Sequence, residues 1–165
     1  MLKLDVAWNP ADAERVAQLR EQLQTNPECS LRAAENEQEE REALAAIRCC
    51  ASASSEKLRY VIVTAADIEA AGGKIKQVDG DCGPADIIHR HYDLLSAPQV
   101  AEALVHALAT RGAMQVIVKT KEKVAPILRG WLEQGRLANF PGQEEKVRLQ
   151  LGLPINPGGS SGDGA

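Results

Sequence analysis

Val61-Ile62-Val63 and its second copy, Val116-Ile117-Val118, are the stretches of this sequence that say most about the fold. Each is a continuous run of β-branched residues, and each leads through a threonine, Thr64 or Thr120, into a stretch with helix-like spacing. Such a run is typical of a strand buried on both faces, and strands of that kind occur mainly in parallel sheets covered by helices. The two copies therefore predict an α/β fold.

Helical and extended segments alternate along the rest of the chain. Periodicity, caps and turn residues predict strands over 2–8, 58–63, 74–78 and 114–118, and helices over 11–25, 31–50, 65–72, 97–111 and 121–134. Thr64 and Asp67 have the spacing of a helix capping box. Residues 85–95 favour a helix, and 143–151 fit either a strand or a short helix. This order predicts a layered α/β sandwich with a mostly parallel or mixed sheet of about four strands and helices packed on it, with an α+β two-layer fold as the alternative.

Length and composition indicate one soluble domain. We place the domain at residues 1–153, and the Gly/Ser-rich stretch 154–165 has the composition of a flexible C-terminal tail. The net charge of -4 argues against general binding to nucleic acid, which needs clustered lysine and arginine. The N-terminal residues lack the apolar core of a signal peptide, and no apolar run approaches the roughly 20 residues that span a membrane. We therefore expect a cytoplasmic protein that contacts no membrane.

Two segments carry opposite charge. Residues 35–42 contain five acidic residues and one basic residue, whereas residues 119–136 contain five basic and two acidic residues. The middle of the helix predicted around the acidic segment is almost wholly polar, so half of that helix should lie in solvent or against a partner. Glu39 and Glu40 in the acidic segment, and Trp131 in the basic one, are therefore candidate interface residues.

The carboxyl ends of the two Val-Ile-Val strands give a candidate anion site. In open α/β sheets ligands bind at that edge, and helix N-termini attract anions. If the strands are parallel, Thr64 lies at the same edge as Lys119, Thr120 and Lys121. These four residues would then bind a phosphate or nucleotide, as in a small-ligand binding protein or enzyme.

The stretch from Cys82 to Asp93 contains two of the three histidines and one of the four cysteines. Cys82 with His89 or His91 as base is a candidate catalytic pair for a thiol-dependent hydrolase. In an extended segment His89, His91 and Asp93 share one face and are candidate metal ligands. On the helix favoured here, however, the two histidines are about 200° apart and cannot share a metal. We therefore expect no metal and no other cofactor.

The remaining motifs favour a protein without catalytic activity. The four cysteines show no C-x-x-C spacing, which favours reduced thiols. The sequence contains no G-x-S-x-G, G-x-G-x-x-G or Walker A motif. We therefore expect a non-enzymatic protein-interaction, assembly or accessory protein that self-associates or binds a protein partner. The alternatives are the small-ligand protein and a metal- or thiol-dependent hydrolase.

Overall fold

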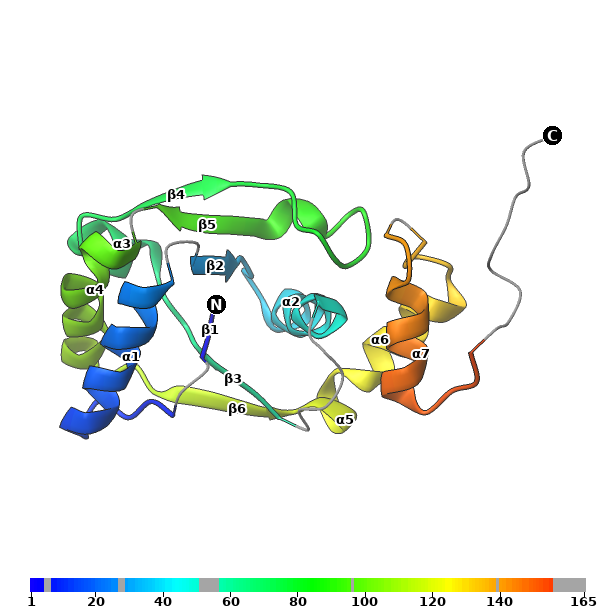
Figure 1. Ribbon diagram of the computed structural model, residues 1–165, viewed down its shortest axis with the longest axis horizontal. Helices are drawn as coiled ribbons and strands as arrows, with labels where there is room; N and C mark the ends of the chain where they lie inside the picture. Colours follow the sequence, from blue (N-terminus) through cyan, green and yellow to red (C-terminus); the bar gives the residue numbers. More distant parts are fainter. Residues whose placement is uncertain (5–6, 27–28, 51–56, 96, 139, 156–165) are drawn as a thin grey trace.

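The computed structural model describes residues 1–4, 7–26, 29–50, 57–95, 97–138 and 140–155. Its strands are β1 (Leu2–Lys3), β2 (Cys29–Arg32), β3 (Lys57–Val61), β4 (Lys74–Gln77), β5 (His91–Leu95) and β6 (Gln115–Lys119) (Figure 1). Its helices are α1 (Ala13–Thr25), α2 (Glu37–Cys50), α3 (Ala65–Ala70), α4 (Ala97–Arg111), α5 (Thr120–Lys123), α6 (Ala125–Glu133) and α7 (Gln143–Leu151), with a 3-10 turn, η1, at Ile88–Arg90. Residues 5–6 of the predicted first strand and 156–165 of the predicted tail lie outside the described residues.

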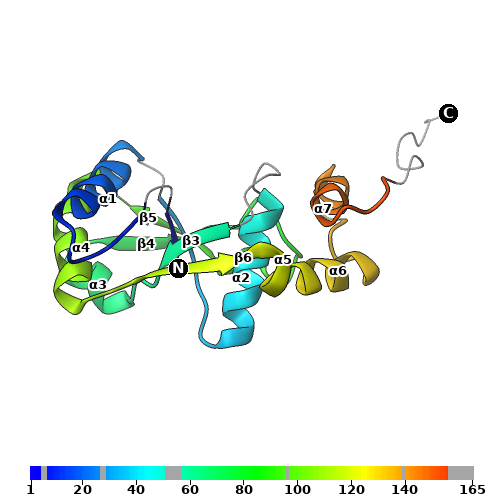
Figure 2. The ribbon, with the colours of Figure 1, turned by 90° about the horizontal axis from the view of Figure 1, so that it is seen from below.

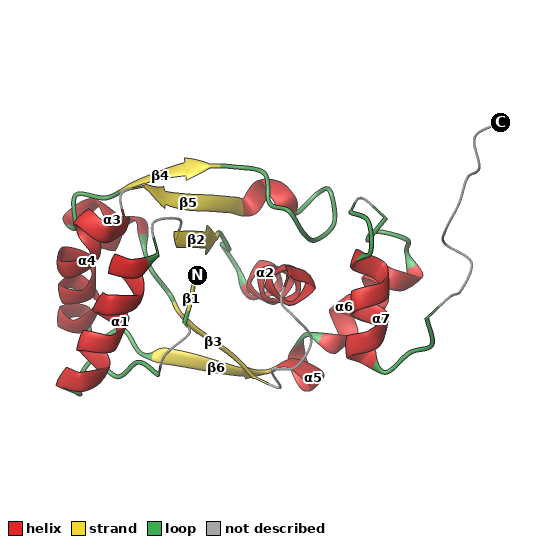
Figure 3. Ribbon diagram, in the orientation of Figure 1, coloured by secondary structure: helices red, strands yellow, loops and turns green. Residues whose placement is uncertain are grey.

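The described strands form one six-stranded sheet in the order β4-β5-β2-β1-β3-β6 (Figure 3). Every neighbouring pair is antiparallel. The predicted sheet of about four mostly parallel or mixed strands is therefore wrong. The two strands that carry Val-Ile-Val residues are direct neighbours that run in opposite directions, with Lys57 opposite Lys119 and Val61 opposite Gln115. A run of β-branched residues indicates a strand, but it carries no information about the direction of the strand beside it.

The middle isoleucine of each Val-Ile-Val copy overturns the interpretation of strands buried on both faces. Ile62 is 45% exposed and Ile117 is 52% exposed, whereas Val61 and Val118 are buried. Because successive side chains of a strand point to opposite faces, each run has one side open to solvent. This half-covered arrangement is typical of antiparallel sheets.

Two segments adopt a different structure from the predicted one. Residues 29–32 form β2, so α2 begins at Glu37 rather than near residue 31. Residues 91–95 form β5, so the helix favoured for 85–95 is wrong, and only η1 is helical there. β2 and β5 pair with each other from Cys29↔Leu94 to Arg32↔His91. Each strand is thus stabilised by backbone hydrogen bonds to a distant segment, which a local pattern does not reveal.

The helices pack in two groups at opposite ends of the sheet (Figures 1 and 2). α1, α3 and α4 pack together at one end, over a core cluster that includes Leu2, Leu19, Leu31, Val61, Leu94 and Leu104. α2 contacts α6 and α7 at the other end, over a cluster that includes Leu44, Leu58, Tyr60, Val118, Leu128 and Trp131. None of the described helices combines the length and apolar composition needed to cross a lipid bilayer.

Candidate functional site

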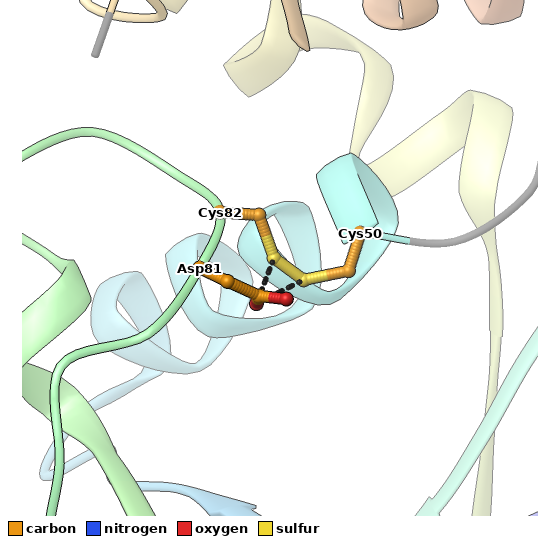
Figure 4. Close-up of side chains that lie close together, drawn as sticks. All are labelled: Cys50, Asp81 and Cys82. Atoms are coloured by element: carbon orange, nitrogen blue, oxygen red, sulfur yellow. Dashed lines mark hydrogen bonds between the residues drawn. A yellow bond between two sulfur atoms is a disulfide. The ribbon is translucent and has the colours of Figure 1, made fainter. Parts of the chain in front are cut away.

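Two segments far apart in the sequence meet at a pair of cysteines (Figure 4). Cys50 is the last residue of α2, and Cys82 lies in the turn between β4 and η1. The structure joins them in a disulfide whose Cα atoms are 5.5 Å apart. Asp81 Oδ1 lies 3.6 Å from Cys50 Sγ and 3.2 Å from Cys82 Sγ. The expectation of reduced thiols is wrong for this pair, because the fold closes α2 onto a turn that is 32 residues later in the sequence.

Two glycines bring this turn close to its neighbours. Gly83 has a φ of 105°, which favours glycine, and a Cβ there would lie 3.2 Å from the Cβ of Ala46 in α2. A Cβ on Gly80 would lie 2.8 Å from Nη1 of Arg32. A larger residue at Gly83 would push the turn away from α2, and one at Gly80 would displace the guanidinium of Arg32.

The guanidinium of Arg32 lies beside the disulfide. Arg32 is only 5% exposed, and its Nη2 lies 3.9 Å from Cys50 Sγ and 3.8 Å from Cys82 Sγ. Its Nη1 is buried and has no hydrogen-bond partner among the described residues. Burial lowers the pKa of Arg32, while the Asp81 carboxylate opposes that shift. A buried cation next to a cysteine favours the thiolate over the thiol whenever the disulfide is open.

A pocket of about 310 Å³ opens beside Cys50, and we call it the cysteine pocket. Its lining includes Lys3, Ser30, Arg32, Cys50, Asp81 and His91. Ser30, Arg32 and His91 share one face of the sheet, because Arg32 pairs with His91 and alternate residues of β2 point the same way. Burial, together with the Arg32 charge, lowers the pKa of His91. The pocket therefore has a cationic side and a neutral imidazole at neutral pH.

The neighbouring cysteine has a different environment. Cys49 is 2% exposed and forms no disulfide. Burial raises the pKa of the Cys49 thiol to about 12, although the Arg32 charge opposes the shift. Adjacent cysteines thus differ in chemistry: Cys49 is an inert core thiol, and Cys50 lies at the surface of a pocket.

The structure does not bring the four residues of the predicted anion site together. Lys119 pairs with Lys57 at the start of β3, whereas Thr64 follows the end of the same strand. Extended chain between these positions spans roughly 20 Å. Thr64 caps α3 by accepting a hydrogen bond from Asp67 N, Lys119 forms an ion pair with Glu122, and Thr120 is 8% exposed.

The histidines of the predicted reactive stretch are separated from one another. His89 is exposed in η1, whereas His91 begins β5 and lies in the cysteine pocket. His91 and Asp93 share a face of the strand. Among the described residues, the side chains close enough to share a metal ion are Cys50, Asp81 and Cys82.

The candidate interface residues are divided between core and surface. Trp131 is 2% exposed and packs in the second core cluster, where the Arg136 guanidinium lies 5.7 Å from its ring. Glu40 accepts a hydrogen bond from the Tyr60 hydroxyl, and Glu39 forms an ion pair with Arg90. The two glutamates are partly exposed on α2, so they remain available as part of a surface.

A second, larger depression lies near the N-terminal end of α2. This groove has a volume of about 640 Å³, and we call it the acidic groove. Its apolar lining includes Leu31, Ile62, Ile68, Ile75 and Tyr92. Its charged lining consists of Glu35, Glu37 and Glu40 together with Arg32, which also lines the cysteine pocket. Leu31 and Ile68 are 7% exposed, whereas Ile62 and Ile75 are each 45% exposed. The groove therefore combines a buried apolar base with exposed aliphatic side chains and carboxylates.

Arg32, Cys50 and the acidic groove escaped the sequence-based prediction. The alternation of Cys29 and Leu31 with Ser30 and Arg32 is the signal that could have placed Arg32 on the face of a strand.

The sequence matches no protein-family model, and no similar curated protein or solved structure was found.

Proposed function

We propose that this protein is a non-enzymatic interaction protein whose acidic groove binds a segment of a partner protein. The segment carries apolar side chains flanked by lysine or arginine. The observation that carries the proposal is the combination, in one groove of about 640 Å³, of exposed aliphatic side chains with three carboxylates. Exposed apolar area rimmed by charge is typical of protein-binding surfaces.

The apolar part of the groove supplies the affinity. Ile62 follows β3 and Ile75 lies in β4, so two distant segments contribute to the lining, and each side chain is 45% exposed. Covering the exposed part of one such side chain is worth about 1 kcal/mol. Leu31 and Ile68 line the same groove and are 7% exposed, so they add little further apolar area when a ligand binds.

The acidic part of the groove supplies the selectivity. Residues 35–42 contain five glutamates, and two arginines offset them: Arg41 forms an ion pair with Glu37, and Arg90 forms ion pairs with Glu39 and Glu42. Net negative charge remains along this rim, so a basic segment is attracted and an acidic one is repelled. Rim charges act mainly on the association rate, and salt should weaken them.

Fluorescence anisotropy with two labelled peptides tests the proposal. The first is a short amphipathic peptide rich in leucine and lysine, and the second has glutamate in place of each lysine. We expect saturable binding of the basic peptide, weaker binding at high salt and no binding of the acidic one. Ile62→Asp should weaken binding on the order of tenfold.

Matched substitutions outside the groove control the experiment. Leu149 in α7 is 53% exposed, so Leu149→Asp places the same charge on a distant aliphatic surface and should leave binding unchanged. Equal effects of the two substitutions, or equal binding of the two peptides, would overturn the proposal. Light scattering measures the molar mass in solution and shows whether the chain self-associates. If it does, and if Ile62→Asp abolishes the self-association, the groove binds a second copy of this chain instead of a partner segment.

A further inference from the structure

We propose that the Cys50–Cys82 disulfide is a thiol–disulfide exchange site at which a small anionic thiol attacks Cys50. This activity differs from the binding proposed for the acidic groove, although Met1 and Arg32 line both depressions. Four features of the molecule carry it: the unequal exposure of the two cysteines, the buried Arg32, the charge of the cysteine pocket and the contrast with Cys49.

Exposure selects the sulfur that is attacked. Cys50 is exposed and lines the cysteine pocket, whereas Cys82 is 4% exposed. A thiolate must approach the sulfur it attacks, so access decides between the two. Attack therefore falls on Cys50, and Cys82 is the leaving group.

Arg32 favours the departure of Cys82. Its Nη2 lies 3.8 Å from Cys82 Sγ, so a cation is already in place where negative charge develops. Asp81 Oδ1 is nearer, at 3.2 Å, and acts in the opposite sense. Asp81 is exposed and screened by water, whereas Arg32 is 5% exposed, so the field of Arg32 is the stronger one inside the protein. Within the part of the chain that the structure describes, Nη1 has no hydrogen-bond partner, so the guanidinium keeps a donor for a ligand or a thiolate.

The pocket selects the class of thiol. Its volume of about 310 Å³ suits a small molecule rather than a protein chain. Lys3 and Arg32 contribute two positive charges to its lining, against one negative charge from Asp81. A thiol that carries carboxylates, such as glutathione, therefore fits this site better than a thiol that carries only an amine.

The exchange balances in two steps. A thiolate RS⁻ attacks Cys50 Sγ; the RS–Cys50 bond forms, the Cys50–Cys82 bond breaks, and Cys82 leaves as a thiolate that takes a proton from water. A second RS⁻ attacks the R sulfur of the mixed disulfide and releases Cys50 as a thiolate. Two molecules of RSH are thereby oxidised to RSSR, and the protein disulfide is reduced to two thiols.

Quenched reactions with three thiols test the proposal on the intact 165-residue chain. Glutathione, 2-mercaptoethanol and cysteamine are compared at equal thiolate concentration, and the opening of the disulfide is followed by mass spectrometry after alkylation. We expect glutathione to react faster than cysteamine by on the order of tenfold at low salt, with the difference shrinking as salt is added. Equal rates would overturn the selection of an anionic thiol.

Two single variants locate the reacting sulfur. Oxidised glutathione should modify Cys50 in Cys82→Ser rapidly and Cys82 in Cys50→Ser slowly, since only Cys50 reaches the pocket. Cys29 and Cys49 are buried thiols in the same chain and should stay unmodified until the protein unfolds. The mixed disulfide trapped in the wild-type protein gives the same information without any substitution. Modification on Cys82 instead, or a purified protein whose two sulfurs are reduced and hold a metal ion, would overturn the proposal.

Discussion

Arg111, the last residue of α4, holds the carboxylate of Asp67 with two hydrogen bonds of 2.8 Å, from Nε to Oδ1 and from Nη2 to Oδ2. The same Nη2 donates to the Ile62 carbonyl oxygen at 2.7 Å. Asp67 Oδ2 also accepts from Thr64 N at 2.7 Å, which completes the capping box of α3. One arginine therefore joins α4 to α3 and to the end of β3, and it fixes the wall of the acidic groove that contains Ile62 and Thr64.

Replacing Asp67 with asparagine should lower the free energy of unfolding by about 1–2 kcal/mol, because the buried carboxylate loses its charge and its hydrogen bonds to the partly exposed Arg111. Burial alone would raise the pKa of Asp67, but the hydrogen bonds from Arg111 and Thr64 outweigh it and hold that pKa below its usual range. The ionised carboxylate thus stabilises the fold above about pH 4, and this contribution is lost as the pH falls through the lowered pKa.

Urea denaturation at neutral pH and at pH values below about 4 measures both effects. The exposed Lys119–Glu122 pair is the control, and Glu122→Gln should cost less than about 0.5 kcal/mol. If the two substitutions cost the same, or if Asp67→Asn leaves the acid sensitivity intact, Arg111 and Asp67 do not couple the two helices.

The local part of the fold could be predicted from the sequence because its causes are local. The capping box formed by Thr64 and Asp67 is confirmed, and the helix predicted over 97–111 is α4. Pro126, predicted in the first turns of the helix over 121–134, lies in the first turn of α6, and a break at Val124 separates α6 from α5. Caps, helix periodicity and proline geometry all act within a few residues.

Strand direction and site geometry depend on distant residues. Arg32 is opposite His91 and also lies beside Cys82, 50 residues away along the chain. The prediction of an anion site assumed parallel strands, and the antiparallel pairing of β3 with β6 separates Thr64 from Lys119. The spacing of residues along the sequence does not reveal which residues of two strands lie opposite each other. Neither the disulfide partner of Cys82 nor the acidic groove could therefore be deduced from it.

Two glycine substitutions should have effects of opposite sign. A Cβ on Gly80 would lie 2.8 Å from Nη1 of the buried Arg32, so Gly80→Ala should displace the guanidinium and cost about 1–2 kcal/mol. A Cβ on Gly130 in α6 would have no heavy atom of the described residues within 4 Å, so Gly130→Ala should stabilise the protein by about 0.5–1 kcal/mol through helix propensity. Thermal unfolding of the two variants measures both changes, and a stabilised Gly80→Ala would show that Arg32 has room to move.

The stability of the protein should fall as the pH is lowered from about 7.5 to 5, in part through His91. Burial and the Arg32 charge lower the pKa of His91 below its usual value, so the unfolded chain binds this proton before the folded one does. The contribution of the neutral His91 to stability is therefore fully present above the pKa of this imidazole in the unfolded chain, and it is lost as the pH falls below that value. The Met1 amino group, whose pKa burial lowers to about 6, acts in the same direction.

His91→Gln should reduce this pH dependence, and the slope that remains should reflect Met1. His89 is exposed in η1, so His89→Gln is the matched control and should retain the wild-type slope. Denaturant midpoints across the pH range give both slopes. Identical slopes for the two variants would mean that the protonation of His91 is not linked to folding.

The disulfide between Cys50 and Cys82 should contribute about 3–4 kcal/mol to the free energy of unfolding, because it closes a loop with a sequence separation of 32. The double variant Cys50→Ser/Cys82→Ser should lose that amount, and reducing the wild-type protein should lower its denaturation midpoint to the same value. The double variant itself should not respond to the reductant, since Cys29 and Cys49 are already thiols. A midpoint that stays unchanged when the wild-type disulfide is reduced would show that packing between α2 and the turn at Gly83 holds this end of the sheet without the covalent link.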